Sequence, residues 1–303
     1  MADTKTIKTK LKSVGNIKKI TRAMEMVARS KMKKSIDKAL ATRPFAYFGL
    51  EFLVNFSYNA NAKNFYYEKQ PGNKTLIVEI TANRGLCGGY NGNMFRELRR
   101  FISGSNLSEV EFVSVGKYAT HHAKLLGGEM VESFVGFGEN ITLKDAQDLT
   151  DAIKRKYQTG EYKNVLVAFT NFVSTLTQKP VVFQLLPLSA ESFKNQLAQD
   201  GDKVNYIEVS DQSVKRDWSL YKIEPSEEEI LDVIIPKLVT SQVYQALLDA
   251  SASEQAARMM AMKNATENAD EIEEDLLLTY NHIRQEGITR ELSEIVAGTL
   301  KQT

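Results

Sequence analysis

The chain has 303 residues and a formal net charge of +1, so its overall charge favours neither an acidic nor a basic partner. Its single cysteine, Cys87, excludes a disulfide framework or a cysteine-rich zinc site built within the chain. No apolar run approaches the roughly 20 residues that span a bilayer, and the N-terminus lacks the apolar core of a secretory signal. Any association with a membrane is therefore expected to pass through a partner.

The N-terminal part is predicted to be one helix over residues 5–42. Its apolar residues recur mostly at steps of three and four, which is the spacing of one helix face. These residues are Ile7, Leu11, Val14, Ile17, Ile20, Met24, Val27, Met32, Ile36 and Leu40. Pro44 is expected to end or kink the helix, because proline has no amide hydrogen and its ring clashes with the preceding turn.

The middle of the chain, from about residue 74 to 222, has the pattern of a layered α/β domain. The expected strands cover residues 75–81, 110–115, 165–172 and 181–188, and the expected helices cover 92–103, 117–126 and 142–158. Strands that alternate with helices favour a largely parallel sheet. The polar segment 196–216 is expected to form a loop or a hairpin.

The C-terminal part, residues 226–300, is predicted to be a second helix, with Pro236 as a possible kink. Residues 237–286 contain neither Gly nor Pro, and fifty helical residues would extend over roughly 75 Å. Small residues recur every fourth position, a spacing that lets a partner helix approach closely. They are Ser253, Ala257, Ala261, Ala265 and Ala269.

The two ends of the chain are oppositely charged. Residues 1–34 carry eleven Lys or Arg against two acids, whereas residues 224–303 carry sixteen Asp or Glu against six Lys or Arg. Such asymmetry indicates either that the ends lie together or that the basic helix binds nucleic acid. We favour an antiparallel pair, because the basic helix also has an apolar stripe that needs a partner. An ordinary helical bundle would explain that stripe too.

A glycine-rich turn at residues 81–92 follows the first strand and opens a helix, where phosphates often bind. It lacks both the G-x-G-x-x-G spacing and a G-K-[ST] lysine. We therefore expect a structural turn without nucleotide or other cofactor, with Cys87 as a small structural residue. The alternative is an enzyme of Rossmann type that binds a nucleotide here.

The other candidate sites are weak. His121 and His122 are adjacent and hence point apart on a helix, and His282 is remote in sequence, so no metal site is expected. The acidic residues between 271 and 275 spread around a helix, which is typical of a solvated or partner-facing surface.

Three groups of residues together resemble the gamma subunits of rotary proton-translocating ATP synthases, across nearly the whole chain. The first group is IKKITRAMEMVA at 17–28, and the second is RGLCGGYN at 84–91. The third combines SQVYQ at 241–245, ASEQAARM at 252–259 and ITRELSEIV at 288–296. The sequence departs from the family at Gly15 and Gly287, and the segment 196–216 is longer than usual.

The resemblance implies a fold and a division of labour. The fold is α/β: N- and C-terminal helices, residues 1–55 and 226–303, form a long antiparallel coiled coil, and residues 74–222 form a central Rossmann-like domain. The coil is expected to turn inside a ring of alpha and beta subunits, with the central domain near the epsilon subunit and the membrane c-ring. The chain would couple proton-driven rotation to ATP synthesis without a catalytic site of its own.

The resemblance also implies residue roles and a location. Met24 matches a position that faces a loop of the beta subunit, and Arg284 and Gln285 match a pair that contacts another beta loop. The chain is expected at the cytoplasmic face of the bacterial plasma (inner) membrane, as a peripheral protein. The alternative location is the matrix side of the mitochondrial inner membrane.

Overall fold

The computed structural model describes residues 4–57, 65–67, 69–105, 107, 109–137, 140–188 and 227–300. The chain divides into two compact units. The helix-pair unit consists of Met1–Arg29 and Arg258–Thr303, and the sheet unit consists of Ser30–Ala257. The boundaries predicted from sequence, 1–55 with 226–303 and 74–222, stay a prediction, and the segment 196–216 lies outside the described residues.

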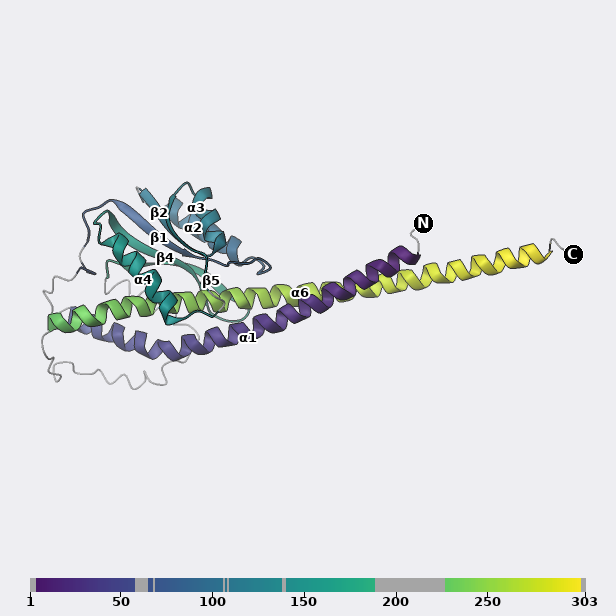
Figure 1. The fold of residues 1–303 in the computed structure, drawn as a ribbon, viewed down its shortest axis with the longest axis horizontal. Coiled ribbons are helices and arrows are strands. Elements are labelled where there is room, and N and C mark those ends of the chain that lie inside the picture. The colour runs from purple at the N-terminus through teal and green to yellow at the C-terminus, as the bar shows by residue number, and fades with distance from the viewer. Residues whose placement is uncertain are drawn as a thin grey trace. The chain divides into compact units, whose positions relative to one another are not determined.

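Two long helices contribute to both units. Helix α1 covers Thr4–Ser57 and helix α6 covers Glu227–Leu300 (Figure 1). The prediction for the second helix is confirmed, but the predicted end of the first at residue 42 is wrong, since α1 continues past Pro44. Proline removes only the bond to the carbonyl four residues earlier. Pro44 is exposed, so water can bond that carbonyl while the helix continues on both sides.

The sheet unit is built on a five-stranded sheet in the order β3-β2-β1-β4-β5. The first four strands in this order are parallel, and β5 is antiparallel to β4, so the prediction of a largely parallel sheet is confirmed. The strands are β1 (Lys74–Ile80), β2 (Glu109–Val115), β3 (Glu129–Phe134), β4 (Tyr162–Phe172) and β5 (Gln178–Leu186). Sequence reasoning missed β3, a short edge strand that is only partly buried and half polar.

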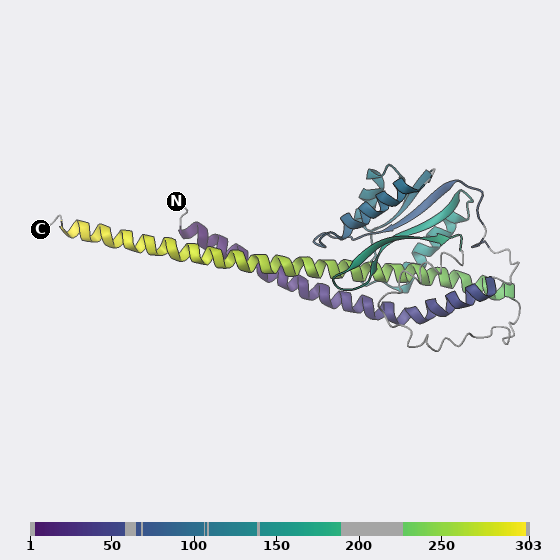
Figure 2. The same ribbon diagram turned by 180° about the vertical axis from the view of Figure 1, so that it is seen from behind.

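Helices cover both faces of this sheet (Figures 1 and 2). Helices α2 (Tyr90–Gly104) and α3 (Lys117–Leu125) pack on one face, over a core that includes Ile77, Met94 and Phe112. Helix α4 (Leu143–Tyr157) packs on the other face, and α6 packs beside it with its apolar residues between 235 and 250. The unit is therefore a three-layer α/β structure in which part of α6 serves as a layer helix.

Within the sheet unit α1 runs antiparallel to α6. The Oγ atoms of Ser35 and Ser251 lie 3.0 Å apart, and Thr42 donates from Oγ1 to Oε1 of Gln245 at 3.0 Å. Partners that advance along α1 thus recede along α6. Between residues 241 and 257 most α6 residues are buried, because the sheet covers one side of the helix and α1 lies against it as well.

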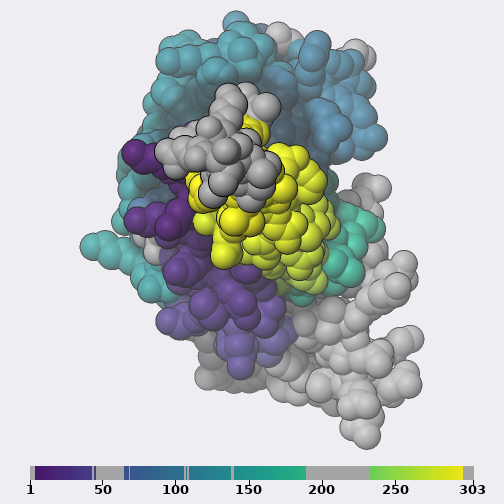
Figure 3. All heavy atoms as spheres, turned by 90° about the vertical axis from the view of Figure 1, so that its right-hand side faces the viewer, coloured from purple at the N-terminus to yellow at the C-terminus, as the bar shows by residue number. Residues whose placement is uncertain are grey.

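The helix-pair unit shows the same antiparallel arrangement. Nζ of Lys18 donates to Oε2 of Glu273 at 3.0 Å, and Oγ1 of Thr266 donates to Oγ1 of Thr21 at 2.7 Å. Figure 3 looks along the helix pair from the end of α6, and Figures 1 and 2 show that α6 extends past the first residues of α1. The predicted antiparallel pairing is therefore confirmed within each unit.

The seam of α1 in the helix-pair unit has a mean spacing of 3.5 residues, as in a coiled coil. Its buried and half-buried positions include Ile7, Leu11, Val14, Lys18, Thr21, Glu25 and Ala28. The expected apolar stripe enters this seam only over its first turns. After Val14 the apolar stripe continues in two steps of three residues, to Ile17 and Ile20. The buried seam instead takes a step of four and then a step of three, to Lys18 and Thr21. As a result Ile17, Ile20 and Val27 lie outside the seam, and the expectation that they pack against the partner helix is wrong.

Candidate functional site

The glycine-rich turn is held in place by backbone and side-chain hydrogen bonds. The amide of Ala82 donates to Oδ1 of Asn91 at 3.1 Å, which ties the start of the turn to the first turn of α2. Leu86 and Gly88 both have φ near +60° (62° and 56°), a left-handed conformation that glycine adopts without cost. The turn is therefore ordered by its own residues, as expected for a structural turn.

Cys87 is buried in this turn. Its Sγ accepts a hydrogen bond from Nδ2 of Asn91 at 3.4 Å, and its thiol points to the carbonyl of Arg84 at 3.8 Å. Both partners belong to the turn and to the first turn of α2, so these contacts hold the thiol inside the structure. The arrangement supports the expected structural role.

The turn lies at the point of the sheet where chain order reverses, between β1 and β4. In open α/β sheets ligands bind outside the carboxyl ends of the strands at such a point. Here α6 reaches that position. The hydroxyl of Tyr90 donates to the carbonyl of Ala250 at 3.2 Å, and Oγ of Ser253 donates to the carbonyl of Thr170, near the end of β4, at 3.0 Å. Ala257 packs on the cluster formed by Ala82, Cys87 and Tyr90.

We call this set of contacts the α6 socket: Ala82, Cys87, Tyr90 and Thr170 around Ala250, Ser253 and Ala257 of α6. The small side chains of α6 at these positions let its backbone come within hydrogen-bond distance of Tyr90. The socket places a helix of the same chain where a doubly wound fold would bind a nucleotide. The turn thus contacts and supports α6. Sequence reasoning expected a structural turn and had no signal for the helix that it contacts.

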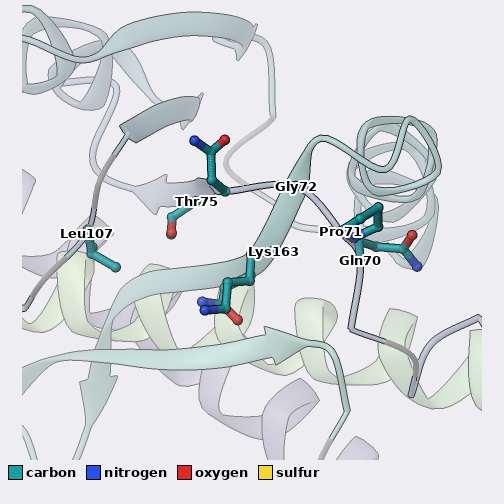
Figure 4. A pocket seen from close by; sticks show the side chains of 8 residues that line it. Gln70, Pro71, Gly72, Thr75, Leu107 and Lys163 are labelled. Atoms are coloured by element: carbon teal, nitrogen blue, oxygen red, sulfur yellow. The ribbon is translucent and has the colours of Figure 1, made fainter.

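A separate polar pocket lies at the opposite edge of the sheet, at the amino ends of β1 and β4 (Figure 4). It is lined by Gln70, Pro71, Gly72, Asn73, Thr75, Leu107, Lys163 and Asn164. In the described part of the chain, no three His, Cys, Asp or Glu side chains gather as metal ligands. The lining of the pocket offers the side chain of one lysine, several amides and a threonine hydroxyl.

The helix-pair unit presents large apolar side chains to the solvent. On α1, Ile17 and Ile20 are 54% and 59% exposed, and Met26 and Val27 are exposed as well. On α6 the exposed set is Ile272, Leu277, Leu278, Ile288, Leu292 and Ile295. Large exposed apolar residues that recur along one unit are typical of a surface that a partner covers.

Polar contacts across the helix pair were not expected from the sequence. Lys18 pairs with both Asp270 and Glu273, and these carboxylates raise its pKa above the ordinary 10.5, Asp270 contributing most. Glu273, one of the acidic residues between 271 and 275, and the preceding Asp270 are therefore ion-pair partners of the basic helix. The opposite net charges of the two ends were the available signal, but charge totals do not identify pairs.

The predicted partner-contact residues lie at two separate levels of the helix pair. Met24 is half-buried, whereas Arg284 and Gln285 are exposed. With Thr21 opposite Thr266, Met24 lies near the level of residue 264. Arg284 is about 20 residues further along α6, or roughly 30 Å at the rise of a helix. The structure does not bring these residues together, so they can serve only as separate contacts.

The histidines are arranged as the sequence predicted. On α3, His121 is exposed and His122 is buried, and they point apart. His282 lies on α6 beside Glu286, with Nδ1 and Oε1 3.3 Å apart. Among the described residues no helix combines the length and apolar character needed to cross a bilayer.

Comparison with known proteins gives one family. The sequence model of the ATP synthase family matches residues 3–300. An ATP synthase gamma chain of Heliobacterium modesticaldum is 38% identical over 293 residues, covering 96% of each chain. A chain in the central stalk/c-ring structure of Tetrahymena thermophila mitochondrial ATP synthase has a TM-score of 0.57 at 26% identity, covering 81% of this chain and 99% of that one.

A second solved structure supports the fold alone. A chain of the Euglena gracilis mitochondrial ATP synthase, in a structure of OSCP, F1 and c-ring in rotational state 3, has a TM-score of 0.63 at 22% identity. The match covers 99% of this chain and 94% of that chain. The long helices and the three-layer sheet unit thus recur together in a distant relative.

Proposed function

The chain belongs to the family of ATP synthase gamma chains, and on that premise we propose that it is a rotor subunit that acts mechanically and has no catalytic site. The single observation that carries the proposal is the exposed apolar surface of the helix pair, which includes Ile17 and Ile20. Exposed isoleucine and leucine side chains add nothing to the stability of an isolated helix pair. Each would contribute about 1.5–3 kcal/mol if a partner buried it. The surface is suited to a partner that encloses it.

We infer that the enclosing partner is the ring of alpha and beta subunits. Two antiparallel helices present different side chains around their circumference, since α1 is basic and α6 is acidic. Each subunit of a surrounding ring therefore meets a different surface, and rotation changes which subunit meets which. Contacts that differ between conformations shift their populations, and this is sufficient to couple rotation to nucleotide chemistry carried out by the partner.

The proposed contacts to beta subunits are Met24, Arg284 and Gln285. Arg284 and Gln285 are exposed near the end of the helix pair. The planar guanidinium of an arginine donates two parallel hydrogen bonds to a carboxylate, which suits it to a loop of a partner. On this proposal both residues affect catalysis through the partner.

The absence of a catalytic role rests on the construction of the sheet unit. The switch point of the sheet holds α6 through Tyr90 and Ser253, and the polar pocket at the other edge has no acid–base pair among its lining residues. The sheet unit therefore serves to hold α6. We propose that it also contacts the epsilon subunit and the c-ring, so that the chain is peripheral to the membrane at the cytoplasmic face of a bacterial plasma membrane.

The test is assembly with the alpha and beta subunits. When the chain is co-expressed with them, Ile17→Glu together with Ile20→Glu should remove it from the purified complex. Both positions lie outside the seam of the pair, so helicity by circular dichroism should stay unchanged. Leu125→Glu is the matched control, because Leu125 is an equally exposed apolar residue on α3 of the sheet unit. Retention of the double variant at the wild-type level would contradict the proposal.

A further inference from the structure

A buried carboxylate and a buried imidazole face each other beneath helix α3. Glu79 lies on β1, the central strand, and its side chain is fully buried. His122 lies on α3 with its side chain 7% exposed, and its Nδ1 is 2.6 Å from Oε1 of Glu79. The ring of Phe95, on α2, lies 4.8 Å from the imidazole ring. Neither residue contributes to the helix pair, the α6 socket or the polar pocket, so the proposed rotor function does not use them.

The surroundings of the pair are otherwise uncharged. The residues beside Glu79 on the neighbouring strands are Ser114 and Ala168, and the core on this face of the sheet is apolar. On α2 and α3 the other ionisable acids and bases are exposed or half-buried: Arg96, Glu97, Arg99 and Arg100, and Lys117, His121 and Lys124. Tyr90 of α2 is buried and donates to the carbonyl of Ala250. Helix α3 also packs on β3, whose Glu132 pairs with Arg155 of α4 on the other face of the sheet.

Because no other charge faces the pair, the number of protons it holds decides its net charge. With one proton between them, Glu79 and His122 form a neutral pair, either as carboxylic acid with imidazole or as carboxylate with imidazolium. A second proton leaves a buried cation, and loss of the first leaves a buried anion. Either uncompensated charge is costly in an apolar core.

Two further observations concern the carboxyl group of Glu79. The second carboxylate oxygen of Glu79, Oε2, has no hydrogen-bond partner in the structure and no exposure to solvent. Burial raises the pKa of Glu79, and the hydrogen bond from His122 opposes that rise. For a raised carboxyl pKa, stability is lost as the pH rises from the unfolded value towards the folded one.

The pair lies beside the supports of the glycine-rich turn. The amide of Ala119, in the first turn of α3, donates to Oγ1 of Thr81 at 2.7 Å, and the amide of Tyr118 approaches the carbonyl of Ala82 at 3.5 Å. Ala82 belongs to the α6 socket. The position of α3 on the sheet therefore affects the turn, and through it the contacts that hold α6.

We propose that Glu79 and His122 form a proton-sensitive latch that fastens α3 and the adjoining turn to the central strand. The latch is closed while the pair holds one proton between its two side chains. It opens when the pair gains a second proton in acid or loses its only proton in alkali. The inference does not depend on the rotor function, since it concerns only contacts inside the sheet unit.

The test is amide hydrogen exchange across α3 in the full chain, measured between pH 4.5 and 9.5 and corrected for intrinsic exchange rates. Wild-type protection of residues 117–125 should be greatest between the extremes and at least about tenfold lower at one end of the range, a change of about 1.4 kcal/mol. Glu79→Gln keeps the shape of the side chain but cannot ionise, so it removes the buried anion and should abolish the loss of protection at the alkaline end. The loss in acid should remain, because one proton on the pair then leaves an uncompensated cation. His121→Gln is the matched control, because it changes the exposed neighbour and should leave the profile as in the wild type.

A second measurement does not depend on any variant. The nitrogen chemical shifts of the His122 ring count the protons on that ring at each pH, and any change in this count should coincide with a change in α3 protection. A flat α3 profile in the wild type, or an equal profile in Glu79→Gln, would overturn the proposal. So would a His122 ring that gains or loses a proton between pH 4.5 and 9.5 with no change in α3 protection. If Glu79→Gln fails to fold, the wild-type exchange and ring titration still decide the outcome.

Discussion

The sheet unit and the helix-pair unit place their apolar residues in opposite ways. The sheet unit buries Phe112, Leu149 and Ile153 almost completely between helices and strands. The helix-pair unit leaves Ile20 and Leu278 at 59% and 69% exposure. A buried apolar side chain stabilises the unit that contains it, whereas an exposed one is available to a partner. The comparison therefore separates residues that hold the chain together from those that serve the assembly.

The largest expected effect is a core truncation in the sheet unit. Phe112→Ala removes a ring from the core beneath α2 and α3 and should destabilise the chain by about 3–5 kcal/mol, through lost burial and the cavity left behind. Leu278→Ala in the helix-pair unit should change stability by less than about 0.5 kcal/mol. Denaturant unfolding of the two variants checks both values. Equal losses would break the distinction between the units.

A smaller loss of stability is expected when a side chain is added at Gly116, next to the start of the glycine-rich turn. Gly116 has φ +93°, and a Cβ there would lie 2.3 Å from the carbonyl oxygen of Thr81. Gly116→Ala should therefore cost about 2–3 kcal/mol, from strain and displaced backbone together. Gly127 also has a positive φ, 72°, but a Cβ there meets no atom within 4 Å. Gly127→Ala, the matched control, should cost only about 1 kcal/mol, and thermal unfolding would show the difference.

Substitutions of exposed residues in the helix-pair unit should alter the activity of the assembled complex without altering the structure of the isolated chain. Arg284→Ala should lower ATP turnover by the assembled complex about fivefold, the effect of losing roughly 1 kcal/mol at an interface. The helicity of the isolated chain should not change, because Arg284 is exposed and no i±3 or i±4 position carries an acid. Normal turnover and normal proton-driven synthesis in an Arg284→Ala, Gln285→Ala complex would remove this contact from the mechanism.

The ion pairs of Lys18 should contribute least among the stability effects. Their carboxylate partners raise the pKa of Lys18 above 10.5, so the stabilisation is complete below the unfolded value and is lost as the pH rises through the higher folded value. Lys18→Met should abolish that alkaline loss, and added salt should reduce the difference between variant and wild type. Arg29→Met, which breaks a pair within α1 only, is the comparison variant.

Nucleotide addition is expected to have no effect on the chain. α6 lies at the switch point of the sheet, and the turn has no lysine placed for a phosphate. Titration of ATP or NAD against the chain should show no saturable binding, by calorimetry or by a shift in unfolding temperature. Specific micromolar binding that disappears on changing Gly88 would show that the turn is a ligand site after all.

The sequence predicted secondary structure correctly wherever the spacing of apolar residues matched the periodicity of the helix or strand. The long helices, four of the five strands and the three helices of the middle region all followed from spacing. β3 was missed because its alternation is short and half polar. The seam of the helix pair was misjudged after Val14, since it continues through Lys18 and Thr21 while the apolar residues continue through Ile17 and Ile20. Periodicity identifies an apolar stripe but does not tell which partner covers it.

The candidate site was less predictable than the fold. The glycine-rich turn was recognised as structural, yet its contact with α6 joins residues about 160 positions apart, such as Tyr90 and Ala250. The pair formed by Glu79 and His122 was also hidden, because Glu79 stands inside an apolar strand and its partner is 43 positions away. Contacts of this kind depend on which helix covers which face of the sheet, and a single sequence does not fix that.

The mean spacing of 3.5 residues along the α1 seam has a mechanical consequence. Helices that meet at this spacing wind around each other with a left hand. A left-handed supercoil of two helices responds differently to the two senses of twisting: one sense tightens the helices onto their seam, and the other unwinds them. The torsional stiffness of the helix pair is therefore expected to differ between clockwise and anticlockwise torque.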